Sequence, residues 1–144
     1  MREGSVVYAV DQARVERSIG AHQALIDLVA EKIRATGSAP RSNRFIDLAA
    51  TVKGQQFIFE MKSATDSNLR EQIRSGLSQL YEYRYLQAAD QARLVLVVER
   101  PLTSDLRWMV DYLTKDRNVA FLWDGDMVSL HCHSRQQREV DFLL

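Results

Sequence analysis

The segment from Arg44 to Lys62 constrains the fold most, because it is predicted to form a tight β-hairpin. Two strand-like runs, Arg44–Val52 and Gln55–Lys62, are joined by the dipeptide Lys53-Gly54. Glycine in the second position of a two-residue connection is typical of hairpin turns, because such turns need a positive φ there. A loop of two residues also fixes which residues of the two strands face each other. Every pairing can therefore be counted from the turn.

The predicted register sorts the side chains of the hairpin onto two faces, since successive side chains of a strand alternate. One face is wholly apolar and is expected to be core: Ile46, Leu48, Ala50, Val52, Phe57, Phe59 and Met61. The other face is mixed and carries Phe45, Asp47, Ala49, Thr51, Gln56, Ile58, Glu60 and Lys62. At one end of the mixed face, Asp47 is predicted to lie opposite Glu60 with Lys62 beside them.

Two carboxylates at this spacing predict a cation site. Directly paired residues of a sheet have Cβ atoms about 5 Å apart, and two carboxylates that close repel each other unless a positive group lies between them. A divalent cation with oxygen ligands would relieve the repulsion between Asp47 and Glu60, with Lys62 next to it. This prediction depends on the turn, because a slip of one residue would send Asp47 to the opposite face.

Composition narrows the class of protein. The chain of 144 residues is predicted to be one domain, 1–144, either alone or as part of a longer protein. A formal net charge of zero argues against a protein that holds nucleic acid by bulk charge alone. The single cysteine, Cys132, excludes an internal disulfide and fits a reducing, cytoplasmic location. No apolar run is long enough to span a membrane, and the N-terminal residues lack the layout of a signal peptide.

The rest of the chain alternates between helical and strand patterns. The first residues, 4–10, are expected to be a short strand or an ordered lead-in. Helices are predicted over Gln12–Thr36, Leu69–Ala89 and from Thr103 or Ser104 to Lys115, and strands over Arg93–Glu99, Val119–Trp123 and Met127–Cys132. This order predicts an α/β fold with a mixed central sheet and helices on both faces.

The second predicted helix, Leu69–Ala89, has three distinct faces. Its core stripe is Leu69, Ile73, Leu77 and Leu80. Beside that stripe runs a polar edge made of Gln72, Gly76, Gln79 and Tyr83, in which the glycine would permit a close approach of the backbone. The third face carries Arg70, Arg74, Tyr81 and Tyr85. Arginine interleaved with tyrosine fits nucleic-acid binding, and a solvated face or a dimer interface are the alternatives.

Three features of the chain belong together: Asp47, the triplet Glu60-Met61-Lys62, and the pair Gln79 and Tyr83. Their combination resembles the PD-(D/E)XK nuclease superfamily, which has the restriction-endonuclease-like fold. The spacing of the last pair is similar to the Q-x-x-x-Y helix motif of its RecB-like branch. The resemblance covers about residues 16–123. The residue before Asp47 is isoleucine rather than the proline of the family pattern, which lowers the specificity of the motif.

The resemblance implies a set of roles. Asp47, Glu60 and the backbone carbonyl of Met61 would bind Mg²⁺ or Mn²⁺, and Lys62 would position or activate the attacking water. Gln79 would lie beside the metal, with Tyr83 in support. In the family the first helix often adds a polar residue near the metal, for which the candidates are Glu16, His22 and Gln23. Competing interpretations are a satisfied core histidine for His22 and a first-turn helix acid for Glu16.

The resulting prediction is a Mg²⁺-dependent endonuclease that hydrolyses DNA phosphodiester bonds in restriction, phage defence or repair. No extra helix with clustered Asn, Gln and Arg is evident for reading the major groove. Specificity is therefore expected from another domain, a partner or nucleic-acid structure. Two cuts in a duplex require two active sites, which favours a homodimer. Two alternatives are a catalytically inactive nuclease-fold domain that acts as a nucleic-acid-binding or assembly module, and a transposase-like or junction-resolving nuclease.

Overall fold

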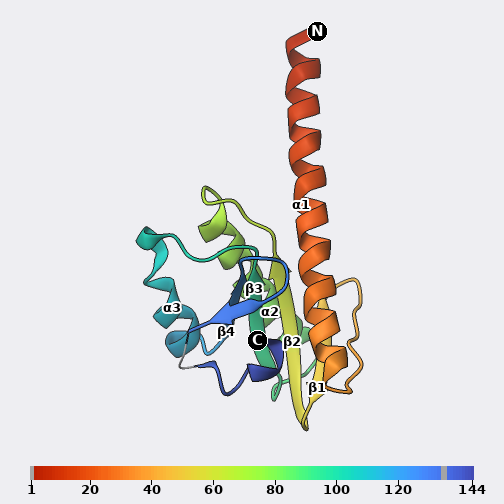
Figure 1. Ribbon diagram of the computed structural model, residues 1–144, viewed down its shortest axis with the longest axis vertical. Helices are drawn as coiled ribbons and strands as arrows, with labels where there is room; N and C mark the ends of the chain where they lie inside the picture. The colour runs from red at the N-terminus through yellow and green to blue at the C-terminus, as the bar shows by residue number, and fades with distance from the viewer. Residues whose placement is uncertain (1, 134–135) are drawn as a thin grey trace.

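The computed structural model describes residues 2–133 and 136–144, with side chains from residue 12 onward, and shows a mixed five-stranded sheet flanked by helices (Figure 1). The main elements are α1 (Arg2–Ala35), β1 (Leu48–Val52), β2 (Gln55–Lys62), α2 (Leu69–Leu86), β3 (Arg93–Val98), β4 (Ala120–Asp124) and β5 (Leu130–Cys132). The shorter helical segments are η1 (Ser104–Leu106), α3 (Met109–Asp111), the π-turn η2 (Tyr112–Asp116) and η4 (Asp141–Leu143). The predicted α/β class with a mixed sheet is confirmed.

The sheet has the strand order β1-β2-β3-β4-β5. The hairpin β1–β2 and the pair β4–β5 are antiparallel, and β2–β3 and β3–β4 are parallel. Each parallel pair needs a crossover, which α2 supplies between β2 and β3. At the hairpin turn Lys53 and Gly54 both have positive φ values, 52° and 80°, as a two-residue turn between twisted strands requires. The predicted register, in which Val52 pairs with Gln55, is confirmed.

Two hydrophobic cores cover the two faces of the sheet. On one face the second half of α1 and the C-terminal residues Val140 and Leu143 pack against alternate residues of β1 and β2. On the other face α2 and the segments that follow β3 pack against the remaining positions, which include Ile58 and Leu96. Strand alternation explains the division, and it places Glu60 and Lys62 on the α2 side because they share a face with Ile58.

The first strand is shorter than predicted. β1 begins at Leu48 rather than Arg44, because the Asn43 side chain accepts hydrogen bonds from the backbone N–H groups of Phe45 and Ile46 and turns the chain there. Ile46 consequently packs with Ile58 in the α2-side core, so its predicted place beside Leu48 is wrong. Phe45 lies outside the strand and is exposed, so its predicted place on the mixed face of that strand is also wrong.

Three other boundaries differ from the prediction. Residues 4–10 belong to α1, a continuous helix of 34 residues whose N-terminal part stands out beyond the sheet (Figure 1). The single helix expected over residues 103–115 is instead divided among η1, α3 and η2. β5 begins at Leu130 rather than Met127, because the carboxylates of Asp124 and Asp126 accept the backbone N–H groups of residues 126–129.

Within the described residues, no helix combines the length and hydrophobicity needed to cross a bilayer.

Candidate active site

Asp47 lies at the bend immediately before β1. Its Oδ2 atom accepts a hydrogen bond from the Met61 backbone N–H at 3.0 Å and lies 3.0 Å from Nε2 of His22 in α1. Because β1 has not yet begun at Asp47, the Asp47 side chain, rather than a backbone carbonyl, accepts the hydrogen bond from the Met61 N–H. Burial alone would raise the pKa of Asp47, but the hydrogen bonds from His22 and Met61 outweigh burial and hold that pKa below its usual value. Asp47 is therefore an anchored, ionised carboxylate.

Glu60, on the neighbouring strand, is almost fully buried, with 3% of its surface exposed. Its Oε1 atom lies 3.8 Å from Nζ of Lys62, and its Oε2 atom has no hydrogen-bond partner. Burial first, and then the negative charge of Asp47, raise the pKa of Glu60 to about 8, against the opposing effect of the Lys62 ammonium. The Glu60 carboxyl group is therefore half protonated near pH 8. A cation beside it, in addition to the Lys62 ammonium, would stabilise its charged form.

The polar edge of α2 forms the other wall of the site. Gln79 donates a hydrogen bond through Nε2 to the Tyr83 hydroxyl at 3.4 Å, and its Oε1 atom is buried with no partner. Burial and the nearby charge of Glu60 both raise the pKa of Tyr83, which places the Tyr83 hydroxyl within electrostatic reach of the carboxyl pair. The structure thus brings Gln79 and Tyr83 to the side of the sheet that carries Glu60 and Lys62.

Gly76 explains how α2 approaches the sheet so closely. A Cβ atom at this position would lie 2.6 Å from Cδ1 of Leu96 and 3.3 Å from Cγ of Lys62. Only a residue without a side chain leaves room for both of these groups. The aliphatic stem of Lys62 is therefore packed under α2, which holds its ammonium group near Glu60.

The donor atoms of this cluster fit a hard divalent cation. Two buried oxygen atoms of this cluster, Glu60 Oε2 and Gln79 Oε1, lack partners, and the Asp47 carboxylate lies close enough to Glu60 for its charge to raise the pKa of Glu60. Among the described residues, no group of three or more His, Cys, Asp or Glu side chains gathers as a metal site. Mg²⁺ is commonly bound through one or two carboxylates while it keeps several waters, so a pair of carboxylates with a nearby amide oxygen is a donor set that this ion accepts.

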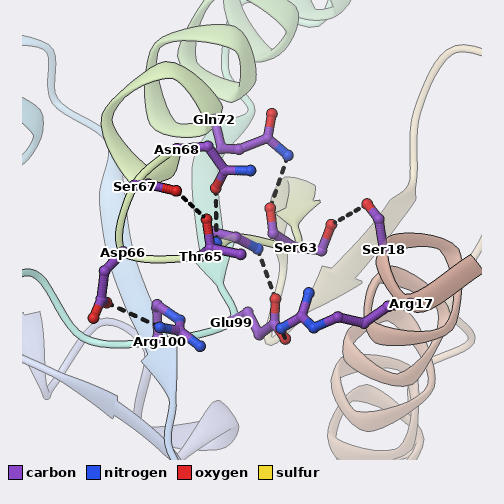
Figure 2. A network of polar contacts seen from close by, with 11 residues as sticks. Arg17, Ser18, Ser63, Thr65, Asp66, Ser67, Asn68, Gln72, Glu99 and Arg100 are labelled. Atoms are coloured by element: carbon purple, nitrogen blue, oxygen red, sulfur yellow. Dashed lines mark hydrogen bonds and ion pairs between the residues drawn. The ribbon is translucent and has the colours of Figure 1, made fainter. Parts of the chain in front are cut away.

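A network of polar contacts fixes the chain directly after Lys62 (Figure 2). Ser63 is buried, its hydroxyl lies 2.8 Å from that of Ser18 in α1, and its carbonyl accepts from Gln72 in α2 at 2.7 Å. Glu99, after β3, accepts from the Ala64 backbone N–H at 2.6 Å and pairs with Arg17 at 2.7 Å. Two helices and a strand therefore meet at the end of β2. The only signal in the sequence is that Ser63 follows the lysine and that Glu99 closes an apolar run.

The candidates on the first helix separate into two groups. His22 is half-exposed and contacts Asp47, so the core-histidine interpretation is wrong. Glu16 is exposed and interacts with Gln12, and Gln23 is exposed and bonds Asp27, so the structure brings neither to the carboxyl pair. A helix turns by about 100° per residue, which puts position 16 about 240° away from position 22.

The arginine and tyrosine face of α2 is divided in the structure. Arg70 and Arg74 are exposed, and the Arg70 guanidinium lies 5.6 Å from the centre of the Trp108 ring. The hydroxyl of Tyr81 donates to the Arg117 carbonyl, and its ring packs on the α2-side core. Tyr85 is 82% exposed. The face is therefore not a uniform surface, because Tyr81 is committed to contacts within the domain.

Comparisons with known proteins give one structural match. No protein-family model matches the chain, and no curated protein matches it in sequence. Among solved structures, the crystal structure of an XisH family protein from Nostoc punctiforme PCC 73102 is 16% identical, with a TM-score of 0.48. The match covers 73% of this chain and 94% of that chain.

Proposed function

We propose that this protein is a metal-dependent nuclease that hydrolyses DNA phosphodiester bonds at the cluster of Asp47, Glu60 and Lys62. The observation that carries the proposal is the buried carboxyl group of Glu60: its Oε1 atom lies near Lys62, its Oε2 atom has no hydrogen-bond partner, and the charge of Asp47 acts on it. Burying a carboxylate without a partner is costly, and the arrangement is relieved when a divalent cation joins the two acids. The motif resemblance supports phosphodiester bonds as the substrate class.

Each residue of the cluster has a distinct part in this proposal. Asp47 and Glu60, together with the Met61 carbonyl and the Gln79 amide oxygen, would hold Mg²⁺ or Mn²⁺. Such an ion, when bound, neutralises charge that builds up on the phosphate and makes water a better nucleophile. Lys62, with its stem packed under Gly76, presents an ammonium group that can donate to a phosphate oxygen or to the attacking water.

The surrounding residues position this cluster. His22 and the Met61 N–H hold the Asp47 carboxylate in place from two directions. The Tyr83 hydroxyl accepts from Nε2 of Gln79 and thereby leaves the amide oxygen of Gln79 as the free end. Removing Asp47 therefore also leaves the Met61 N–H without its acceptor, so Glu60 is the cleaner position for a test of activity.

The test is incubation of plasmid, linear duplex and single-stranded DNA with the full chain in Mg²⁺ or Mn²⁺, beside Glu60→Gln and a matched control, Glu71→Gln. Glu71 is an exposed acid in the first turn of α2. We expect the wild type and Glu71→Gln to cut DNA and Glu60→Gln to lose at least about 100-fold in rate. Absence of cutting with every metal, or equal cutting by Glu60→Gln, would contradict the proposal.

One observation favours a second function, a metal-free module that binds nucleic acid or assembles with a partner. Oδ2 of Asp47 already has two polar partners, which is an arrangement that holds together without a cation. Calorimetric titration with Mn²⁺ separates the two functions. A nuclease site predicts saturable binding that Glu60→Gln abolishes, whereas the metal-free module predicts no heat of binding from either protein.

Cutting both strands of a duplex at one place requires two active sites, so we propose that the protein acts as a homodimer or beside a partner domain. Sedimentation of the full chain with and without a short duplex tests the first possibility. A monomer in both conditions that still makes double-strand breaks would exclude it.

A further inference from the structure

A hollow of about 340 Å³ lies on the same face of the sheet as the carboxyl pair, on the side nearer the hairpin turn. Its floor is formed by Ile46, Ala49 and Ile58. Ala49 pairs with Ile58 across the hairpin, and each lies two residues from one of the acids. Because side chains two apart on a strand share a face, Ile58 lies next to Glu60 on β2, so the hollow begins one side-chain position from that acid.

The rim of the hollow is polar and rich in amides. It is formed by Arg41, Asn43, Gln56 and Gln87. Oδ1 of Asn43 already accepts two backbone N–H groups, which leaves its amide nitrogen as a donor. An apolar floor with convergent amide and guanidinium groups is suited to a flat heteroaromatic ring that carries donors and acceptors at its edge.

Two rows of residues lead from the acids to this hollow. Along β2 the row is Glu60, Ile58 and Gln56, with steps of about 6.6 Å, and along α2 it is Gln79, Tyr83 and Gln87, with steps of about 6 Å. The rows run side by side, because β2 and α2 are connected antiparallel elements and Gly76 brings them into contact beside Lys62. One step along either row corresponds to one nucleotide of an unstacked strand.

We propose that the hollow receives the base of the nucleotide next to the phosphate held at the carboxyl pair, an inference that rests on the proposed function. The base would lie against Ala49, the half-buried residue of the floor, with its edge towards the amides of Gln56 and Gln87. A volume of about 340 Å³ is within the range of about 300–1,000 Å³ of small-ligand pockets. A base enters such a site only when it is unpaired, so the substrate is single-stranded or locally opened DNA.

The experiment measures binding and cutting separately. Binding of the full chain to three fluorescent oligonucleotides is compared in Ca²⁺: single-stranded DNA, its duplex, and a single strand of abasic sugar-phosphates. We expect the single strand with bases to bind at least about 10-fold more tightly than the other two, since stacking of a base contributes about 1–3 kcal/mol. Equal binding of the normal and abasic strands would overturn the inference.

Substitutions locate the effect. Ala49→Leu fills the hollow, and Gln56→Ala removes a rim amide at an exposed position where folding is not at risk. Ser78→Leu is the control, because it adds apolar bulk at an exposed position of α2 that does not line the hollow. Both test variants should lower binding of the normal strand towards that of the abasic strand, with Ser78→Leu like the wild type. If both test variants bind like the wild type, the hollow holds no base.

Failure of this inference is distinguishable from failure of the proposed function. If Mg²⁺ and Mn²⁺ support no cutting but base-dependent binding is lost in Ala49→Leu, the nuclease proposal fails and the base site stands. If DNA is cut and an abasic nucleotide on either side of the cut leaves the rate unchanged, the nuclease proposal stands and the base site fails.

Discussion

Replacing Glu60 by glutamine should change how the stability of the metal-free protein depends on pH. The ordinary pKa of a glutamate is 4.5, and that of Glu60 in the folded protein is about 8. Between these values the folded protein holds a proton that the unfolded chain has released. The free energy of unfolding therefore falls as pH rises through this window. Asp47 does not add to this slope, because the pKa of Asp47 is lowered in the folded protein. Protonation of Asp47 therefore destabilises the protein only at a lower pH than this window.

The size of the effect follows from the difference between the two pKa values. A difference of about 3.5 pH units at about 1.4 kcal/mol per unit gives an upper figure of about 5 kcal/mol. Relaxation of the structure and entry of water around an ionised, buried acid reduce this figure. We therefore expect the wild type to lose about 2–4 kcal/mol of unfolding free energy between pH 5 and pH 8.

Denaturant unfolding in EDTA at a series of pH values measures this loss. Glu60→Gln, which cannot ionise, should be nearly flat over the window and more stable than the wild type at pH 8, and Glu71→Gln should keep the wild-type slope. Saturating Mn²⁺ should stabilise the wild type at pH 8 and leave Glu60→Gln unchanged. A wild-type protein whose stability does not fall between pH 5 and pH 8 would refute the reasoning.

Three further predictions concern the walls of the site. Gly76→Ala should destabilise the protein by about 1–3 kcal/mol in denaturant unfolding, because the added Cβ meets a buried leucine. Gly20→Ala, in open space on α1, should stabilise the protein by about 0.5–1 kcal/mol. Equal effects of the two substitutions would contradict the close approach of α2 to the sheet at Gly76. Glu99→Ala should lower the free energy of unfolding by about 1–3 kcal/mol, because it leaves the Ala64 N–H without an acceptor. The comparison variant Asp66→Ala removes an exposed ion pair and should lower the free energy of unfolding by less than about 1 kcal/mol. Lys62→Met should keep Mn²⁺ binding in calorimetry while plasmid cutting falls at least about 100-fold, and normal cutting by this variant would remove the lysine from the proposal.

Local chemistry in the sequence was sufficient for the hairpin and its register. A two-residue hairpin turn needs positive φ values, which the glycine of Lys53-Gly54 adopts readily, and the turn then dictates every pairing from Leu48 to Phe59. The same counting placed Asp47 near Glu60, although β1 begins only at Leu48, one residue after Asp47. The apolar alternation of β2 likewise predicted that Phe57, Phe59 and Met61 share one core face.

The prediction lost accuracy where a side chain replaced a backbone partner. Asn43 and Asp126 accept backbone N–H groups and end or delay strands, and a hydrophobic pattern contains no information about such bonds. Ile46 changed faces for this reason. The length of α1 was also underestimated, because the apolar residues in the sequence 2–11 fall in one continuous run, 6–10, rather than in a stripe repeated at spacings of three and four.

The sequence by itself determined the elements whose causes are local: the tight turn, the alternation of β2, the E-x-K triplet and the polar edge of α2. Only the tertiary structure decided which distant groups complete the site. His22 reaches Asp47 and Arg17 reaches Glu99, because helices that pack on opposite faces of the sheet converge at one end of β2. The amide rim forms at the other end of that strand, where the residue after α2 comes close to Gln56. Such contacts depend on the distance and rotation at which packed elements settle, and no spacing within one segment of chain specifies either quantity.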